Sequence, residues 1–568
     1  MTRLRDQIQR LFSEQSKAAP FILDAAAVLF LLLVGLTVWP MDGDPSLPFW
    51  ASPADPLLEG PDSGAWAANI LAWSDGDYGY LEAQRMPTYV LFSGLAMAWT
   101  GSVALAGHLV NHLAHLLTPL LLYGIGRMMG SRAVGFGAGL MSAVCPFLVQ
   151  ASWRFGVDPT VAFVIPLSLW AGLLAARWWW LGPIAGVAGG LAMTAHFTTL
   201  FHALPAAFAV LLFASGWRTR MLAFSGYVAG AGLTWWGIFR TFNWGGLSTL
   251  NEAVPEGILK GSVDTMDGVQ ASPSWDAPSE VLRENMSGAL GESVQLVLGA
   301  LNTSALSWTL LLAAAWIGVL GVGLGDPKER RGLRGIWGLL DWRGGLVLIL
   351  ALGPLPFLAA AQAEERYSYN LLPIVCLLVA RGIVGTTLLV ERGIQRGWAR
   401  WRPGLLAFVV VAFVARSYWS ASVWKHKPLP PPMSARAGWI IGEAIQKEFE
   451  EIEGVVCSFR EAIPYTGGRY CPKTRCPNYV NIEAFWDCLT IMDNECEGEG
   501  PIPYVVMWRR TGDEREIPRK AMDQWAIETW GTVAEIAVPL KTPEFMADIV
   551  SIPREDIRAR RLLPAEGE

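Results

Sequence analysis

The sequence predicts a multi-pass α-helical membrane protein with a separate C-terminal α/β domain. The 568 residues are 52% hydrophobic and only 17% charged, with a mean hydropathy of +0.33, a balance too apolar for a soluble enzyme of this length. About eleven apolar stretches follow one another along the chain. After them, a proline-rich stretch precedes a more polar C-terminal part with strand-like patterns.

The first apolar stretch, residues 20–40, is long enough to cross a bilayer core, which takes roughly 20 helical residues. It is longer than the apolar region of a signal peptide, and no small-x-small cleavage motif follows it, so we expect a retained first helix. Residues 88–98 are apolar but short, which predicts an interfacial or re-entrant helix. The remaining predicted spans are 104–123, 133–150, 160–176, 181–195, 200–215, 221–239, 304–325, 345–361, 371–389 and 405–419.

Clusters of Lys and Arg between these stretches predict the orientation of the chain. They comprise Arg127 with Arg132, Arg177, Arg218 with Arg220, and the segments 327–334 and 391–402. Because cationic loops are retained in the cytoplasm, the N-terminus is expected inside, and the first loop and the C-terminal part outside. The abundance of Ala, Gly, Arg and Trp favours a bacterial inner membrane. The net charge of −6 gives no basic surface of the kind that binds nucleic acid, so we expect no nucleic-acid partner.

The predicted domain boundaries follow from these patterns. A transmembrane domain is expected over residues 1–419, with a first external loop at 41–103 and a long external loop at 243–303. The linker 420–432 contains "KPLPPP", which cannot continue a helix. In the periplasmic part, 433–568, we expect a helix over 434–449 and strands at 454–459 and 503–508.

Five of the seven cysteines cluster in this C-terminal part: Cys457, Cys471, Cys476, Cys488 and Cys496. An oxidising compartment favours disulfide bonds among them, with one thiol left over. A zinc site built from the thiolates of Cys471, Cys476, Cys488 and Cys496 is the alternative. Cys145 and Cys376 lie alone inside predicted spans, where we expect them to pack as small apolar side chains.

Carboxylates gather at the predicted outer ends of the helices. The first loop holds Asp62, Asp75, Asp77 and Glu82, and the second holds Asp158. Such groups suit a general base for an acceptor hydroxyl, or a divalent cation site. The segment "SDGD" also has the composition of a solvated turn, and Asp158 before Pro159 also fits a helix N-cap.

Several arginines lie on the same side, against the usual sign preference: Arg85, Arg154, Arg240, Arg366 and Arg416. Guanidinium groups bind phosphate oxygens in pairs, so a converging set would suit a phosphorylated lipid head group. The alternative for each arginine is contact with anionic lipid at the membrane surface.

Four polar residues in the span from residue 104 share one helical face: His108, Asn111, His112 and His115. Histidines inside a membrane usually face the bundle interior or a wet cavity. A metal site from His108 and His112 competes here with hydrogen bonding between helices. His196 and His202 flank the break between two short spans and fit the same external cavity.

The order of several segments resembles the GT-C superfamily of membrane glycosyltransferases, especially its protein O-mannosyltransferase and aminoarabinose-transferase-like branch. The segments that carry the resemblance are "PDSGAWAANILAWSDGDY", "RMPTYVLFSGLAMAWTG", "HLVNHLAHLLTPLLLYGIGRMMGSR", "ASWRFGVDPTVAFVIPLSLW", "GLAMTAHFTTLFHALPA" and "EERYSYNLLPIVCLLVARGI". The match covers roughly the first 240 residues with moderately specific motifs, and later parts more loosely.

The resemblance implies Asp62 as the catalytic carboxylate and Asp158 as a second, supporting carboxylate. Contacts to substrate or phosphate would come from Arg85, Arg154, Arg366, Glu82, His108, His112 and His196. Two positions depart from the family pattern: the usual pair of adjacent acids is Asp62–Ser63 here, and His196 stands where lysine is common. The cofactor therefore stays open, with Mg or Mn held by Asp62 and Asp158 as the candidate.

The resemblance also implies a reaction. A sugar would pass, with inversion, from a polyprenyl-phosphate donor to an extracytoplasmic glycan, lipid or protein acceptor, in contact with membrane lipids. Two alternatives remain: a non-catalytic scaffold that keeps the GT-C fold, and a transporter of lipid-linked substrates, for which the sequence lacks a clear inverted repeat.

Overall fold

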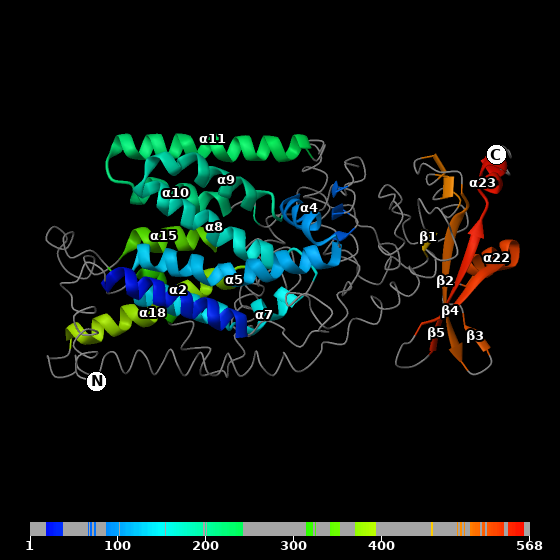
Figure 1. Cartoon of the computed structure of the whole chain (residues 1–568), viewed down its shortest axis with the longest axis horizontal. Helices are drawn as coiled ribbons and strands as arrows, with labels where there is room; N and C mark the ends of the chain where they lie inside the picture. Colours follow the sequence, from blue (N-terminus) through cyan, green and yellow to red (C-terminus); the bar gives the residue numbers. More distant parts are fainter. Residues whose placement is uncertain are drawn as a thin grey trace, which may run out of the picture.

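The computed structural model describes a helical bundle and a C-terminal sheet (Figure 1). The described residues are 19–37, 66–67, 69–70, 73–74, 87–101, 103–153, 155–196, 199, 202–241, 314–321, 324, 341–352, 370–393, 456–457, 486, 489–490, 493–494, 500–511, 514–516, 520–538 and 544–561.

The helices of the bundle run mostly along one axis (Figure 1). They are α2 (Ala19–Thr37), α4 (Pro87–Thr100), α5 (Val103–Met129), α6 (Arg132–Ala143), α7 (Pro146–Trp153), α8 (Asp158–Arg177), α9 (Gly182–Met193), α10 (Ala203–Phe213), α11 (Trp217–Thr241), α15 (Trp342–Ala351) and α18 (Leu372–Gly393). A 3₁₀ turn, η2 (Trp179–Leu181), precedes α9, and residues 314–320 are also helical. The largest buried apolar cluster includes residues from α4, α5, α6, α8 and α18.

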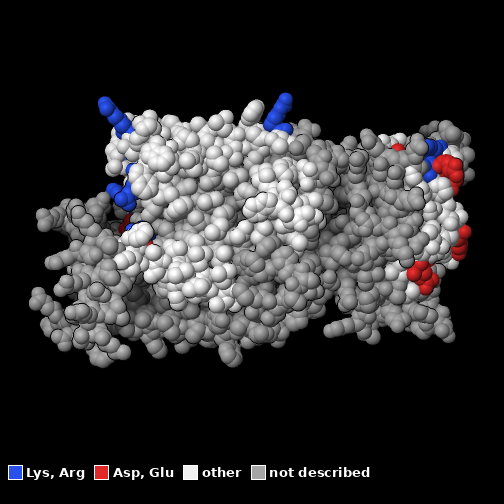
Figure 2. All heavy atoms as spheres, viewed as in Figure 1, with Lys and Arg blue, Asp and Glu red and all other residues white. Residues whose placement is uncertain are grey.

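Two of the described helices, Leu105–Met129 and Asp158–Arg177, are long and apolar enough to cross a membrane, and several shorter helices are also apolar. α11 has no charged residue between Arg220 and Arg240. In Figure 2 the described surface of the helical part is largely white, and the blue cations lie near its ends. This distribution fits a lipid-facing belt between two polar boundaries.

The predicted span 133–150 is wrong as a single helix, because the structure divides it. α6 ends at Ala143, and α7 begins at Pro146. Proline has no backbone N–H and clashes with the preceding turn, so it interrupts one helix and begins another readily. Over residues 88–98 the structure has α4, whose 14 residues would extend only about 21 Å and cannot span a bilayer core.

Small residues allow α9 and α11 to approach closely. Gly182, Gly186 and Gly190 recur at every fourth position of α9. A Cβ atom on Gly186 would overlap the Tyr227 carbonyl oxygen, and one on Gly230 would overlap the Pro183 carbonyl oxygen. Helix pairs in membranes rely on such small faces, because lipid removes most of the hydrophobic drive for association.

Substitution of Gly186 by Leu should therefore separate α9 from α11 and lower the free energy of unfolding by about 1–3 kcal/mol. The matched control is Gly232→Leu in α11, where an added Cβ would meet open space. Unfolding of the purified protein in detergent, followed by tryptophan fluorescence, would measure both. Equal stability of the two variants would contradict the proposed packing.

An acid in the first helix ties three helices together at one end of the bundle. Asp24 of α2 pairs with Arg127 of α5 (Nη2 to Oδ2, 2.7 Å) and with Arg132 of α6 (Nε to Oδ1, 2.7 Å). The Tyr123 hydroxyl donates to the same carboxylate. Asp24 is not among the sequence candidates, although a lone acid inside an apolar span was a usable signal.

Arg381 of α18 forms a second set of polar contacts near this end, and its side chain is fully buried. Its three guanidinium nitrogens donate to the Gly318 carbonyl (3.1 Å), the Met129 carbonyl (3.0 Å) and the Asp341 carboxylate (3.1 Å). Asp341 also caps α15 by accepting from the Gly344 N–H. One side chain therefore joins the ends of three helical segments to α18.

The C-terminal part contains a five-stranded sheet of order β1-β2-β5-β4, with β3 paired to β2. Its elements are β1 (Val456–Cys457), β2 (Ile502–Thr511), β3 (Glu514–Glu516), α22 (Lys520–Trp530), β4 (Thr532–Val538), β5 (Glu544–Ile552) and α23 (Arg554–Arg561). β1 is parallel to β2, and the other pairs are antiparallel. The predicted strands at 454–459 and 503–508 thus correspond to β1 and β2.

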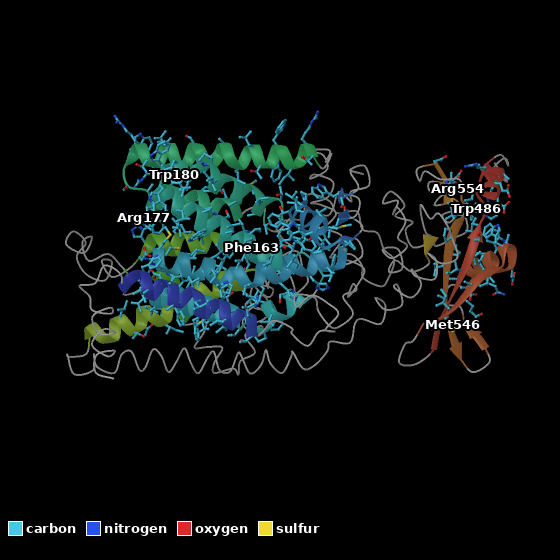
Figure 3. The ribbon with its side chains drawn as sticks, in the orientation of Figure 1. Phe163, Arg177, Trp180, Trp486, Met546 and Arg554 are labelled. Atoms are coloured by element: carbon cyan, nitrogen blue, oxygen red, sulfur yellow. The ribbon has the colours of Figure 1, made fainter. Side chains whose placement is uncertain are left out.

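Alternate apolar residues along β2 and β5 form the core of this sheet: Ile502, Tyr504, Val506, Met546, Val550 and Ile552. Arg554 of α23 donates to the Gly500 carbonyl and pairs with Asp493 (3.3 Å), which fixes α23 beside the sheet (Figure 3). The predicted helix 434–449 and the linker 420–432 lie outside the described residues. The domain boundaries stay predictions.

Three of the seven cysteines lie among the described residues. Cys145 and Cys376 are buried and free, as expected for small apolar side chains. Cys457 lies in β1, whereas Cys471, Cys476, Cys488 and Cys496 lie outside the described residues. Disulfide pairing, and the zinc alternative, remain predictions.

Candidate functional site

Segments that are far apart in the sequence meet at the N-terminal end of α5. α4 begins against the end of α9, because the Thr88 N–H donates to the Thr194 carbonyl (3.1 Å) and the two threonine Oγ1 atoms lie 2.8 Å apart. The loop between α7 and α8 is held to α5, because Asn111 Nδ2 donates to the Gly156 carbonyl (2.9 Å). We call these residues, with the ring contacts that follow, the junction.

Aromatic rings fill the centre of the junction. The Tyr89 ring lies edge-on to Trp66 (centroids 5.5 Å apart) and to Phe155 (6.0 Å). Phe155 in turn lies edge-on to His108 (5.8 Å). Trp73 packs against Gly94 of α4, so that a Cβ atom there would overlap the indole ring. The first loop, α4, α5 and the α7–α8 loop are thereby fixed to one another.

The junction lies at the opposite end of α5 from the ion pairs of Asp24. His108 and Arg127 are 19 residues apart on this helix, which corresponds to about 28 Å along its axis. The cationic ends of α5 and α8 thus lie at one end of the bundle, and the described part of the first loop lies at the other. Figure 3 shows Arg177, at the end of α8, far from the sheet.

The polar face of α5 points into the protein. His108, Asn111 and His112 are each 3% exposed or less, and His115 is half-buried. The rings of His108 and His112 are close to perpendicular, with centroids 6.2 Å apart. The described residues contain no group of three His, Cys, Asp or Glu side chains that could hold a metal ion.

His196 and His202 lie between α9 and α10, and both are buried. The His196 N–H donates to Thr199 Oγ1 (3.0 Å), and the Thr199 hydroxyl donates in turn to the carbonyls of Ala192 and His196. This turn follows Thr194 directly, so His196 enters the junction from the α9 side. Thr88, Thr194 and Thr199 were missed at the sequence level, because threonine is ordinary in apolar helices.

Asp158 is the first residue of α8, and Val157 is the N-cap. The expectation that Asp158 is itself the N-cap is therefore wrong by one position, with Pro159 following as the second helical residue. A carboxylate in the first turn interacts favourably with the positive end of the helix dipole. Asp158 follows the Phe155–Val157 loop, so its backbone belongs to the junction.

Eight of the carboxylate and arginine candidates lie outside the described residues: Asp62, Asp75, Asp77, Glu82, Arg85, Arg154, Arg366 and Arg416. Three of them have close sequence neighbours in the junction. Asp62 comes four residues before Trp66, Arg85 comes three residues before Thr88, and Arg154 comes directly before Phe155. The structure therefore places His108, Asn111 and His112 at the junction, with His196 two residues after Thr194 and Asp158 as the first residue of α8. The charged candidates outside the described residues stay predictions.

The comparisons with known proteins concern this same region. Residues 84–236 match the family model described as "Dolichyl-phosphate-mannose-protein mannosyltransferase". That range extends from just before α4 into α11, and it contains every junction residue except Trp66 and Trp73. No curated protein matches the chain.

Among solved structures, the crystal structure of ArnT from Cupriavidus metallidurans bound to undecaprenyl phosphate matches with a TM-score of 0.52 and 13% identity, over 94% of this chain and 98% of that one. AglB from Archaeoglobus fulgidus, in complex with an inhibitory peptide and a dolichol-phosphate, matches with a TM-score of 0.45 and 13% identity, over 94% and 76% of the two chains. Arabinofuranosyltransferase AftD from Mycobacteria matches with a TM-score of 0.48 and 15% identity, over 94% and 41%. At these identities the likeness concerns the fold alone, and only the first match is close enough to support it.

Proposed function

We propose that this chain, which has the fold of the GT-C superfamily of membrane glycosyltransferases, transfers a sugar from a polyprenyl-phosphate donor to an extracytoplasmic acceptor. The observation that carries the proposal is the junction. It lies opposite the end of the bundle that carries Arg127 and Arg132, which we call the basic end. It joins the first loop, α4, the α7–α8 loop and the α9–α10 turn. These are the segments that contain or directly follow the predicted acid and most of the predicted cations.

The proposed reaction is a single displacement with inversion. An acceptor hydroxyl oxygen attacks the anomeric carbon, and the bond between that carbon and the phosphate oxygen breaks. The electron pair leaves with the polyprenyl phosphate, and the acceptor proton passes to a carboxylate. The site must therefore supply a base for the acceptor and positive charge for the leaving phosphate.

Asp62 is the proposed base. It precedes Trp66 by four residues, a length of chain that reaches at most about 14 Å. Because the Trp66 ring packs on Tyr89, the first loop enters the site from the side of α4. Asp158, at the start of α8, is the proposed second carboxylate, which orients the acceptor or the base.

The proposed cations for the leaving phosphate are Arg85, Arg154 and Arg366. Arg85 lies four residues before Tyr89, and Arg154 lies directly before Phe155. Because the rings of Tyr89 and Phe155 are in contact, both segments are fixed to the same aromatic cluster. Guanidinium groups suit this role because they hold two phosphate oxygens at once and keep their charge. His108, His112 and His196, with Glu82, are proposed to line the sugar and phosphate cavity.

A divalent ion, Mg or Mn, would supply additional charge for the phosphate if Asp62 and Asp158 held it. Of these two donors only Asp158 is described, and the described residues hold no set of three metal donors. No step above passes through a metal ion.

The proposed donor is an undecaprenyl-type lipid phosphate, because the matching ArnT structure is bound to undecaprenyl phosphate. The proposed location is a bacterial inner membrane, with the junction and the C-terminal sheet on the periplasmic side. There the C-terminal domain would cover or orient the acceptor. The sugar and the acceptor class are left open between glycan, lipid and protein.

Turnover of a labelled lipid-linked sugar by the purified protein tests the proposal. We expect release of polyprenyl phosphate and transfer of the label to an acceptor from the same membrane. Binding of lipid phosphate alone would not separate an enzyme from a scaffold that keeps the fold. Absence of turnover with a range of lipid-linked sugars, by a protein that still binds them, would favour the scaffold.

A further inference from the structure

A cavity of about 520 Å³ opens at the basic end of the bundle, between the α5–α6 connection and the last turns of α18. It is lined by Arg127, Ser131, Arg132, Ala133, Val384, Thr387 and Leu388. It is distinct from the proposed active site, since Arg127 lies about 28 Å along α5 from His108. We call it the basic-end cavity.

The described lining of this cavity carries an excess of positive charge. Arg127 and Arg132 both contribute to it, and none of the described residues that line the cavity is acidic. Asp24 of α2 contacts both guanidinium groups. Both arginine side chains keep more than two fifths of their surface exposed, at 48% and 42%, so an incoming anion can reach them.

The start of α6 adds to the same field. Ser131 is its N-cap and accepts from the Val134 N–H, and the 12-residue helix then runs away from the cavity. The positive end of the helix dipole therefore points toward the space beside the two arginines. The charge of the side chains and the direction of the helix favour the same kind of ligand, an anion with several oxygens.

The opposite wall is apolar. Val384 and Leu388 of α18 line it together with Ala133, and the Thr387 hydroxyl is bonded to the Ile383 carbonyl of its own helix. A free inorganic anion gains nothing from such a wall. A phospholipid does, because its phosphate can contact the guanidinium groups while the first carbons of its acyl chains lie against α18.

We propose that the basic-end cavity binds the phosphate head group of an anionic phospholipid in the leaflet at this end of the bundle. Bound there, the lipid would contact α5, α6 and α18 at once and thus stabilise the end of the bundle that Asp24 holds together. Figure 2 shows exposed cations at this end of the helical part, which would attract the same leaflet.

The test compares the retention of phosphatidylglycerol and phosphatidylcholine by the purified full-length protein in native mass spectrometry. Arg127→Gln removes one cation, and Leu388→Trp fills the cavity without changing a charge. The matched control is Arg218→Gln, an exposed arginine at the start of α11 that does not line the cavity. A folded state is checked for each variant by its unfolding in detergent.

We expect the wild-type protein and Arg218→Gln to prefer phosphatidylglycerol. Arg127→Gln should lower that preference about fivefold, because one basic residue near an anionic surface contributes roughly that factor. Leu388→Trp should also lower it, which a merely diffuse attraction between charges would not explain. If Arg127→Gln does not fold, Leu388→Trp decides.

Two results would overturn the proposal. Equal preference in the wild type, Arg127→Gln and Leu388→Trp would mean that the lipid is held elsewhere. Displacement of the lipid by millimolar inorganic phosphate, with the phosphate stabilising the protein as much as the lipid does, would identify a free anion as the ligand. Sugar transfer does not enter the readout, so failure here leaves the proposed function untouched.

Discussion

Replacement of Asp62 by Asn should abolish most sugar transfer, with a loss of about 10²- to 10⁴-fold in kcat. Asn keeps the size of the side chain and one oxygen that accepts hydrogen bonds, but it cannot take the proton from an acceptor hydroxyl. Because the proposed donor contacts come from the arginines rather than from this acid, KM for the lipid-linked sugar should change little. The measurement is steady-state turnover of labelled donor by purified protein.

Asp75→Asn provides the matched control. It makes the same chemical change in the same loop, within the turn-like segment "SDGD", and should leave turnover near the wild-type value. Wild-type turnover in Asp62→Asn would remove this acid from the mechanism. An equal loss in both variants would point to a general role of negative charge in the first loop.

Substitution of Arg381 by Ala should have the largest effect on stability, lowering the free energy of unfolding by about 3–5 kcal/mol. The change leaves the Asp341 carboxylate and the carbonyl groups of Gly318 and Met129 without the donors that Arg381 supplies, in a place where the guanidinium is fully buried. Unfolding by a denaturing detergent, followed by tryptophan fluorescence, measures the effect.

Two further variants define what Arg381 contributes. Arg381→Lys keeps the charge, but one ammonium group cannot reach three acceptors that lie on three different segments, so it should recover only part of the loss. Arg177→Ala removes an exposed arginine that stacks on Trp178 and should be nearly neutral. Equal stability of Arg381→Ala and Arg177→Ala would contradict the proposed role of the hydrogen bonds of Arg381.

The helical elements were predictable because hydropathy is a local property. The predicted stretches 104–123 and 160–176 correspond to α5 and α8, the two described helices that are long and apolar enough to span. The exception is the predicted span 133–150, which is predominantly apolar, but Pro146 divides it into α6 and α7. A hydropathy profile averages over such a break, whereas the chemistry of one proline decides it.

The candidate site was predictable only in part. The shared face of His108, Asn111 and His112 follows from helical periodicity, and the structure buries all three. Helical periodicity does not predict which other segments pack against this face. Thr88 meets Thr194 across more than 100 residues of sequence, and nothing in either segment indicates the other as its partner.

Sequence patterns alone were enough to predict a helical membrane protein and the helix ends that carry cations, because both depend on the composition of short segments. Its order of motifs was enough to indicate the GT-C fold, which the structural match to ArnT confirms. The folded chain was needed to show that Asp24 binds Arg127 and Arg132, that Arg381 joins four segments, and that a cavity opens beside them. Those contacts depend on how helices distant in sequence pack, and a short stretch of residues contains no information on its packing partner.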